Sequence, residues 1–251
     1  KAIQDIKPAV IKGYGSVLNL LANKLIEEKI KLKKPRLIFT DSEILPPEVR
    51  ENIENAFGAP VIDIYGTWET GNIAFECSCR KGYHIALDSV IMEFLKDGKH
   101  AEPDEDGEMV VTVLNNYSTP FIRYNLLDIA AYTNEQCPCG RTFPLMTRIK
   151  GRKNDYMISG DGKKISYFNS YFSRTLSNIY EYQIIQEEIN FFKILIIPGK
   201  SYKNEGENIF IPVIKRFFPD AAIDIKLVDA IERGPAGKFA AFKSNVKAPD
   251  G

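Results

Sequence analysis

The 251-residue sequence lacks several features that mark specialised classes of protein. Its 33 basic and 33 acidic residues cancel, so no overall field attracts nucleic acid or an anionic membrane. No apolar run approaches the roughly 18 residues of a membrane helix, and the opening residues have no signal-peptide character. We therefore predict a cytoplasmic protein that has neither nucleic acid nor a membrane as a partner.

Histidine is also scarce, which limits the chemistry that the chain can perform. One of the two histidines, His100, falls in a charged turn, where an exposed side chain is more typical than a general base. No serine, histidine and carboxylate occur in the spacing of a known hydrolytic triad. Hydrolase chemistry is therefore a poor explanation of this sequence.

What the sequence does contain is the composition of a globular protein with an α/β pattern. The 44% apolar and 26% charged residues suffice for one large or two smaller domains. Helical periodicity predicts helices at 16–26 and 47–57, and short apolar runs at 37–40 and 61–65 predict buried strands. The residues expected on the inner face of the first helix are Leu20, Leu21, Leu25 and Ile26.

Two changes of pattern divide the remaining sequence. From about 84 to 132, strand-like segments alternate with turns, which predicts a mainly antiparallel region. After Gly151 the order becomes β-α-β-β-α-β, with helices near 166–179 and 206–218, as in a small sheet-and-helix domain. We therefore predict part of a large α/β domain at 1–153 and a small α+β domain at 154–251.

Four residues have side chains suited to binding a nucleotide. Tyr65 ends a predicted strand and offers a flat ring, while Glu69 offers an oxygen ligand for a hard cation. Asp128 can accept hydrogen bonds from two hydroxyls, and Lys238, on a Gly-Pro-Ala-Gly loop, is a mobile point charge. Each also has an ordinary structural explanation: a packed tyrosine, a solvated glutamate, an interdomain ion pair and an exposed lysine.

In order and spacing, the segments around these residues resemble one known family. The matching segments are 37–43, 57–69, 120–128, 137–141, and the motifs that begin at Gly151 and Arg233. Together they resemble the carboxyl-terminal half of an adenylate-forming enzyme of the phenylacetate–coenzyme A ligase type. The resemblance covers nearly the whole chain.

The resemblance implies a two-step ligation. ATP, with magnesium, and a small carboxylic acid would give an acyl-adenylate and pyrophosphate, and coenzyme A would then take the acyl group and leave AMP. Lys238 and Glu69 would be catalytic, and Asn154 would be the hinge of a mobile small domain. The residues that would bind the nucleotide are Tyr65, Gly66, Thr67, Asp128, Arg152 and Glu43.

The cysteines give a second signal. All four occur as two Cys-x-Cys pairs, Cys77/Cys79 and Cys137/Cys139, and His84 closely follows the first pair. Thiolates and an imidazole are the ligands of closed tetrahedral zinc sites. We predict a structural zinc held by Cys77, Cys137 and Cys139, with either Cys79 or His84 as the fourth ligand. Disulfides and unligated buried thiols are the alternatives, and a cytoplasmic setting disfavours disulfides.

Several features depart from the family pattern. Trp68 stands where a serine or threonine hydroxyl is usual, and Leu127 and Ser42 replace usual glycines. The Ser/Thr/Gly-rich phosphate loop would lie upstream of Lys1, which is not a methionine. We therefore expect a chain that is inactive alone, its missing half belonging to the same enzyme or being supplied by another chain, as in a homodimer. The alternatives are a non-catalytic zinc-stabilised module and an adenylating ligase with a different acceptor.

Overall fold

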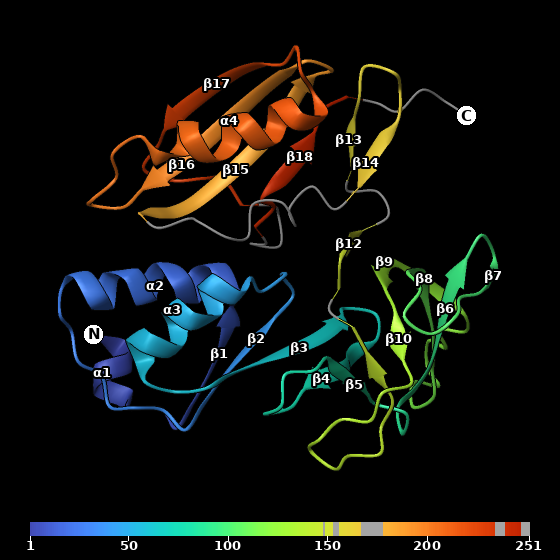
Figure 1. The fold of residues 1–251 in the computed structure, drawn as a ribbon. Coiled ribbons are helices and arrows are strands. Elements are labelled where there is room, and N and C mark those ends of the chain that lie inside the picture. Colours follow the sequence, from blue (N-terminus) through green and yellow to red (C-terminus); the bar gives the residue numbers. More distant parts are fainter. Residues whose placement is uncertain (148, 153–155, 167–177, 234–238, 247–251) are drawn as a thin grey trace. The chain divides into compact units, whose positions relative to one another are not determined.

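The computed structural model describes residues 1–147, 149–152, 156–166, 178–233 and 239–246, and Figure 1 labels most of their helices and strands. The contacts divide the chain into two compact units. Unit 1 comprises 1–15, 32–45 and 57–154, and unit 2 comprises 16–31, 46–56 and 155–251. No helix within the described ranges has the length and apolar character needed to cross a membrane.

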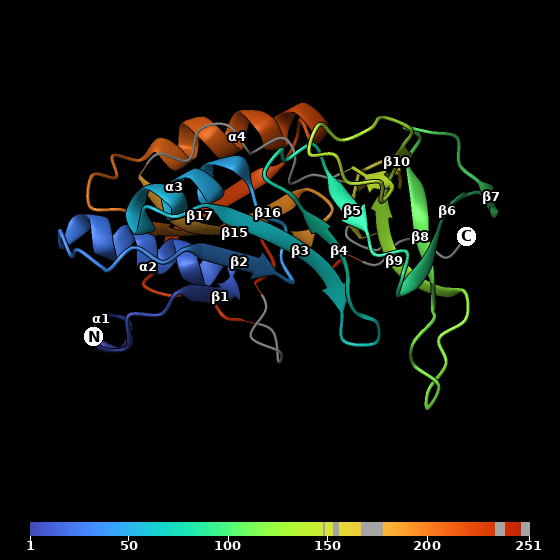
Figure 2. The same cartoon turned by 90° about the horizontal axis from the view of Figure 1, so that it is seen from below.

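A seven-stranded mixed sheet is the first part of unit 1. The parallel strands β1 (Val10–Tyr14), β2 (Leu37–Asp41) and β3 (Val61–Thr67) lie side by side, as Figure 2 shows, and follow the short helix α1 (Ala2–Ile6). The sheet continues with antiparallel strands in the order β4 (Gly71–Glu76), β5 (Tyr83–Ile85), β11 (Leu145–Met146) and β10 (Tyr132–Thr133). Both strands predicted in the amino-terminal region, β2 and β3, are confirmed.

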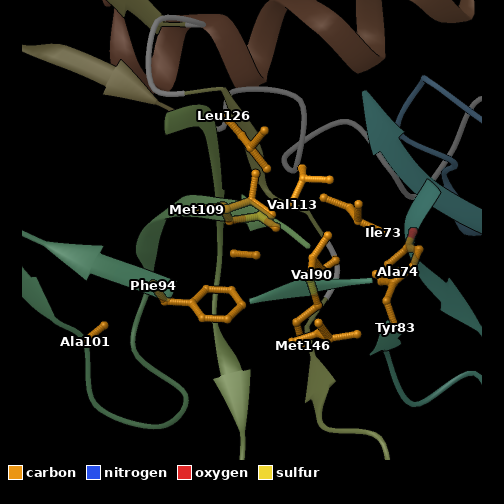
Figure 3. Packing of buried hydrophobic residues seen from close by; sticks show 13 residues of the cluster. Ile73, Ala74, Tyr83, Val90, Phe94, Ala101, Met109, Val113, Leu126 and Met146 are labelled. Carbon is orange, nitrogen blue, oxygen red and sulfur yellow. The ribbon is translucent and has the colours of Figure 1, made fainter. Parts of the chain in front are cut away.

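A five-stranded antiparallel sheet completes unit 1. Its strands, in spatial order, are β12 (Gly151–Arg152), β9 (Tyr124–Ala130), β8 (Gly107–Val113), β6 (Val90–Lys96) and β7 (Lys99–His100). These pairings confirm the antiparallel character predicted between 84 and 132. Val90 and Phe94 face the core in Figure 3 while Ile91 is exposed, because successive side chains of a strand point to opposite faces.

Unit 2 contains a small sheet with one covering helix. The strands β17 (Ala222–Leu227), β16 (Phe191–Pro198), β15 (Ile179–Glu188) and β18 (Phe242–Ser244) are neighbours in that order. The helix α4 (Glu205–Phe217) buries Phe210 and Ile214, four residues apart on one face, in the core of this sheet. The helix predicted near 206–218 is therefore confirmed.

The order predicted for this unit is incomplete in two respects. Two strands were not predicted. The first is β14 (Lys164–Ser166), which forms a hairpin with β13 (Tyr156–Ile158), and the second is β18. The helix predicted at 166–179 falls mainly on residues 167–177, which lie outside the described residues. Its expected first and last residues are strand residues, because Ser166 ends β14 and Ile179 begins β15.

The two helices predicted in the amino-terminal region are present as α2 (Gly15–Glu27) and α3 (Pro47–Phe57). Gly58 directly follows α3 with φ of 66°, a left-handed conformation that lets glycine end a helix. The inner face expected for α2 is partly wrong, since Ile26 is half exposed. Leu18, Ala22 and Leu25 are the buried residues, because their spacing follows the helical repeat more closely.

Candidate functional site

The carboxyl ends of β2 and β3 lie at one edge of the seven-stranded sheet. Asp41, the last residue of β2, pairs with Ile64 of β3, so the two strands end at the same edge. Glu43 lies two residues beyond β2 at this edge, where β3 ends at Thr67. The chain then turns back into β4. In open α/β sheets, ligands bind beyond the carboxyl ends of the strands. The predicted site residues between 43 and 69 therefore belong to a favourable edge.

Tyr65 and Asp128 are joined directly. The Tyr65 hydroxyl donates a hydrogen bond to Oδ2 of Asp128 at 2.6 Å, and Nε of Arg152 lies 3.4 Å from Oδ1. Asp128 is buried, so these donors compensate its carboxylate for lost water. Burial, followed by the charge of Asp128, raises the pKa of Tyr65, and its hydroxyl therefore remains a donor at neutral pH.

Glu69 is held in the adjoining turn by a second tyrosine. The Tyr124 hydroxyl donates to Oε1 of Glu69 at 3.2 Å. The turn itself is braced by the Thr70 amide, which donates to the Thr67 hydroxyl at 3.3 Å. The backbone amide of Glu69, and next the Thr67 hydroxyl, lower the pKa of this carboxyl, which is therefore ionised as a cation ligand must be.

Arg152 links these two tyrosine–carboxylate pairs. In the pairing of β12 with β9, Arg152 stands opposite Asp128. Its positive charge acts on Tyr65, Glu69 and Tyr124 as well. The structure therefore brings Tyr65, Glu69, Asp128 and Arg152 into one cluster, which we call the carboxylate cluster. It also adds Tyr124, a residue that sequence reasoning missed and that only its place four residues before Asp128 could have suggested.

Two replacements of usual glycines keep a glycine-like backbone. Ser42 has φ of 67° and Leu127 has φ of 59°, both in the left-handed region. Only glycine enters this region without steric cost. The Leu127 amide donates to Oδ1 of Asn125 at 2.8 Å, which stabilises the turn just before Asp128. The backbone shape that glycine would favour thus persists although the side chains differ.

Gly66 and Trp68 define the turn beside the cluster. A Cβ on Gly66 would lie 2.2 Å from the carbonyl oxygen of Gly71, so no larger residue fits there. Trp68 is 84% exposed, and the neighbouring Thr67 hydroxyl already contacts Thr70. The turn therefore presents an indole ring to solvent where the family pattern has a hydroxyl.

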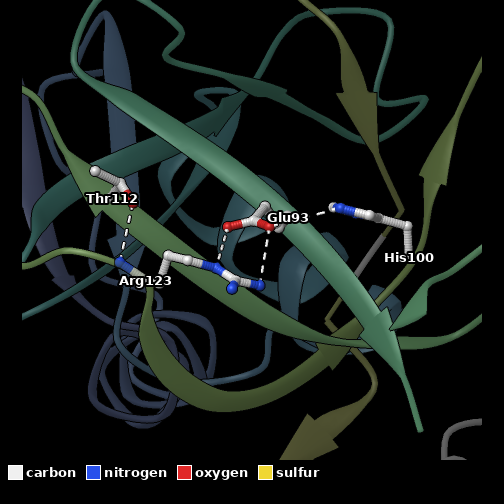
Figure 4. Close-up of polar contacts among 4 residues, drawn as sticks. All are labelled: Glu93, His100, Thr112 and Arg123. Atoms are coloured by element: carbon white, nitrogen blue, oxygen red, sulfur yellow. Dashed lines mark hydrogen bonds and ion pairs between the residues drawn. The ribbon is translucent and has the colours of Figure 1, made fainter. Parts of the chain in front are cut away.

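Other polar residues of this region have a separate arrangement. Nε and Nη2 of Arg123 donate to the two carboxylate oxygens of Glu93 at 3.1 and 3.2 Å, as Figure 4 shows. His100 lies 3.8 Å from the same carboxylate and its side chain is 75% exposed, as predicted, although it belongs to β7 and not to the turn that precedes this strand. Lys238 and Asn154 lie outside the described residues, so their predicted roles remain predictions.

A second cluster, the metal cluster, contains Cys77, His84, Cys137 and Cys139. Their ligand atoms all lie within 4.8 Å of one another. Sγ of Cys77 is 3.5 Å from Sγ of Cys137, and Sγ of Cys139 is 3.4 Å from Nε2 of His84. Pairing of β11 with β5 places Leu145 opposite His84 and so brings the loop that holds Cys137 and Cys139 to this strand.

The hydrogen bonds of this cluster suit a cation. The Phe143 carbonyl lies 3.2 Å from Nδ1 of His84 and can only accept, so Nδ1 carries the proton and the Nε2 lone pair faces the thiols. The hydrogen bond from the Arg141 backbone amide is the main reason that the pKa of Cys139 is lowered to about 6. Burial opposes this effect, and the Arg141 side chain adds to it. Hydrogen bonding to the Cys139 backbone lowers the pKa of Cys137, yet burial and neighbouring thiols outweigh it and raise this pKa to about 12. Crowding of the thiols therefore disfavours a second negative charge beside Cys139 unless a cation lies among them.

The structure distinguishes the two candidates for the fourth place. His84 is fully buried and belongs to the set of four, whereas Cys79 does not. Cys79 is partly exposed and packs against Cys77, Cys137 and Leu145 from outside that set. Spacing could not separate them, because both residues follow Cys77 within a short turn and a short strand.

Comparisons with known proteins place this geometry in context. Residues 157–245 match the family model of the CapK C-terminal domain. The chain is 26% identical over 253 residues to Protein CapK of Staphylococcus aureus, covering 98% of this chain and 55% of that protein. It is 29% identical over 164 residues to a phenylacetate-coenzyme A ligase of Thermus thermophilus, covering 62% of this chain and 37% of that protein. The chain thus spans about half, or less, of the curated relatives it matches.

A solved structure shares the fold. A 2-hydroxyisobutyryl-CoA ligase in its postadenylation state superimposes with a TM-score of 0.80 at 22% identity, covering 97% of this chain and 56% of that chain. The fold is therefore the mixed α/β fold of adenylate-forming ligases. In sequence the chain is similar to phenylacetate–coenzyme A ligases and to CapK, which confirms the resemblance predicted from the sequence.

Proposed function

We propose that this chain is the carboxyl-terminal half of an AMP-forming acid–thiol ligase and that the carboxylate cluster binds the nucleotide. The observation that carries this proposal is the convergence of Tyr65, Asp128, Arg152 and Glu69 near the carboxyl end of β3. Such convergence of a ring, two carboxyl groups and a guanidinium matches the parts of ATP. A packed tyrosine and a solvated glutamate would need no such grouping.

Each residue of the cluster has a distinct part in the proposed mechanism. The Asp128 carboxylate, which accepts from Tyr65 and pairs with Arg152, would also accept hydrogen bonds from the ribose hydroxyls. Tyr65 is held by its hydroxyl and offers a ring to the base, while Arg152 adds donors for ribose or phosphate. Glu69 would hold the magnesium that accompanies ATP.

The reaction itself requires parts beyond the described residues. ATP and a carboxylic acid would form an acyl-adenylate and pyrophosphate, and the thiol of coenzyme A would displace AMP to give a thioester. Lys238 would stabilise charge between the acid and the α-phosphate, and rotation near Asn154 would exchange the two half-reactions. The proposed domain boundary lies at 153/154.

We also propose that the metal cluster holds a structural zinc through Cys77, His84, Cys137 and Cys139. Three thiolates and one neutral imidazole with a fixed tautomer fit tetrahedral zinc. The four ligands leave no open position for water, so the ion would join β4 and β5 to the loop before β11. Its contribution would be stability rather than chemistry.

Binding of AMP to this chain tests the nucleotide proposal. Trp68 is the sole tryptophan and adjoins Glu69, so its fluorescence reports on ligand in the cluster. We expect AMP to change this fluorescence, and Asp128→Asn to weaken binding by roughly 10-fold or more, since hydrogen bonds to charged groups contribute about 1.5–3 kcal/mol. The matched control is Asp97→Asn in the β6–β7 turn, which should bind like the parent chain. No binding, or equal binding by Asp128→Asn, would refute the proposal.

One observation favours a second candidate, a non-catalytic module that binds nucleotide without turnover. The exposed Trp68 replaces the hydroxyl that the family pattern uses for phosphate. The two candidates differ in acid-dependent exchange of pyrophosphate into ATP, measured with the amino-terminal half supplied. Exchange identifies a ligase, and a panel of thiols and amines then identifies its acceptor.

A further inference from the structure

The two Cys-x-Cys segments of the metal cluster form equivalent turns. In the first, the Arg80 amide donates to the Cys77 carbonyl at 3.1 Å, and in the second the Gly140 amide donates to the Cys137 carbonyl at 3.2 Å. The residue after the second cysteine is left-handed in both, with φ of 54° at Arg80 and 79° at Gly140. Cys79 therefore occupies in the first turn the place that Cys139 occupies in the second.

The equivalence of the turns is not matched by the side chains. Cys139 contributes its sulfur to the set of four, whereas the place that Cys79 would take belongs to Nε2 of His84. Cys79 nevertheless packs against Cys77 and Cys137, in the same partly buried state as Cys139. Cys79 is therefore a fifth potential ligand beside the metal cluster. The equivalent turn that begins at Cys137 already contributes its second cysteine, Cys139, to the set of four.

We propose that Cys79 is an alternate ligand, so that the cluster can bind zinc through either three thiolates and His84 or through four thiolates. The inference rests on the proposed zinc site. Zinc has no geometric preference that distinguishes the two sets, since both are common tetrahedral arrangements. The exchange requires the Cys79 sulfur to move toward the other thiols and the His84 imidazole to withdraw from the metal, while the backbone of the Cys79 turn keeps its hydrogen bond.

The charges around the cluster support both arrangements. Four thiolates would leave one more negative charge than three thiolates and an imidazole. Arg80 directly follows Cys79, and Arg141 lies two residues after Cys139, to whose thiolate its side chain hydrogen-bonds. These cations reduce the cost of the additional thiolate. In the parent chain His84 is the fourth ligand, because the hydrogen bond from its Nδ1 to the Phe143 carbonyl already orients the imidazole.

Cobalt substitution tests the inference, because the absorption of tetrahedral Co²⁺ distinguishes three thiolates from four. The parent chain and Cys79→Ser should both bind one equivalent with the spectrum of three thiolates and one nitrogen. His84→Ala should still bind one equivalent, now with the stronger thiolate-to-metal absorption of four sulfurs, and lose no more than about 10-fold in affinity in chelator competition. The double variant His84→Ala/Cys79→Ser should bind at least about 100-fold more weakly than the parent. Ser78→Ala, between the two cysteines, is the control.

The outcomes separate the inference from the zinc proposal beneath it. If the parent chain binds no Co²⁺ or Zn²⁺, the zinc proposal fails. If the parent binds but His84→Ala binds no better than the double variant, Cys79 is not an alternate ligand. Should His84→Ala not fold, Cys139→Ser with and without Cys79→Ser repeats the comparison with the imidazole retained. Equal metal affinity of those two variants would likewise overturn the inference.

Discussion

The carboxylate cluster and the metal cluster are both built from side chains of unit 1, yet they differ in how complete they are. The metal cluster has three buried members, four mutually close ligand atoms and a carbonyl that orients its histidine. The carboxylate cluster has a buried aspartate, but Glu69, Tyr124 and Arg152 are exposed. A closed site stabilises the fold, whereas an open site leaves room for a ligand and for further residues.

The difference also shows what each site requires of its surroundings. Zinc ligands must exclude water and share one charge, so their partners must be buried close together. A nucleotide site must admit a large polar ligand, so its carboxylates retain lone pairs and access. We therefore expect changes in the metal cluster to affect folding and changes in the carboxylate cluster to affect binding.

The largest effect should follow loss of a metal ligand. Cys137→Ser should weaken zinc binding by about 100-fold or more and lower the midpoint of thermal unfolding, because binding energy of a structural zinc is folding energy. Chelator competition and melting in the presence of zinc measure the two effects. Ser78→Ala is the control, and a variant that keeps zinc and its melting temperature would show that the two clusters do not differ as argued.

A smaller effect is expected from Tyr65→Phe. This change leaves Oδ2 of the buried Asp128 without its phenol donor, which should cost about 1.5–3 kcal/mol of unfolding free energy and weaken AMP binding. Urea unfolding and calorimetry measure these quantities. Tyr117→Phe, at a position that is 89% exposed, is the matched control and should change neither. Unaltered AMP affinity in Tyr65→Phe would contradict the role given to the Asp128 contact.

Relief of backbone strain should have an effect of opposite sign. Leu127→Gly removes a left-handed leucine, whose cost is about 1–2 kcal/mol, but adds the conformational entropy of glycine, about 0.5–1 kcal/mol. We expect a gain of about 0.5 kcal/mol in unfolding free energy. Leu87→Gly, also partly exposed but not at a positive φ, should instead lose stability. A loss in both would remove the strain argument.

Trp68→Thr should leave the stability of unit 1 within about 0.5 kcal/mol of the parent, because the indole is exposed. It restores a hydroxyl beside Glu69, so AMP and ATP affinity should rise. Calorimetric titration measures the change, and Trp68→Phe, which removes the indole without adding a hydroxyl, is the control. Equal affinities for the two variants would show that this position does not contact phosphate.

The smallest effect concerns the ionisation of Glu69. Because its pKa is lowered in the folded state, the carboxylate contributes stability above its unfolded pKa and loses that contribution as the pH falls through the folded value. Tyr124→Phe removes one minor donor and should raise this pKa slightly, as a titration followed by carboxyl NMR signals would show. A lowered value in the variant would contradict the assigned hydrogen bond.

Sequence patterns predicted the structure correctly where a residue type has one common structural role, as apolar runs have in buried strands and paired cysteines have in metal sites. The runs at 37–40 and 61–65 became β2 and β3, and the pairing of the cysteines indicated a shared centre. Patterns failed where partners come from distant strands. Tyr124 is an exposed residue at the start of β9, and only its contact with Glu69 reveals its place in the cluster.

The sequence by itself determined the alternation of apolar residues, the supply of thiols and the order of motifs, because these depend on neighbours along the chain. The tertiary structure alone decided that His84 rather than Cys79 faces the thiols, that Tyr65 donates to Asp128, and that Ser42 and Leu127 keep left-handed backbones. The first two outcomes depend on how distant strands pair and pack, which sets which side chains meet.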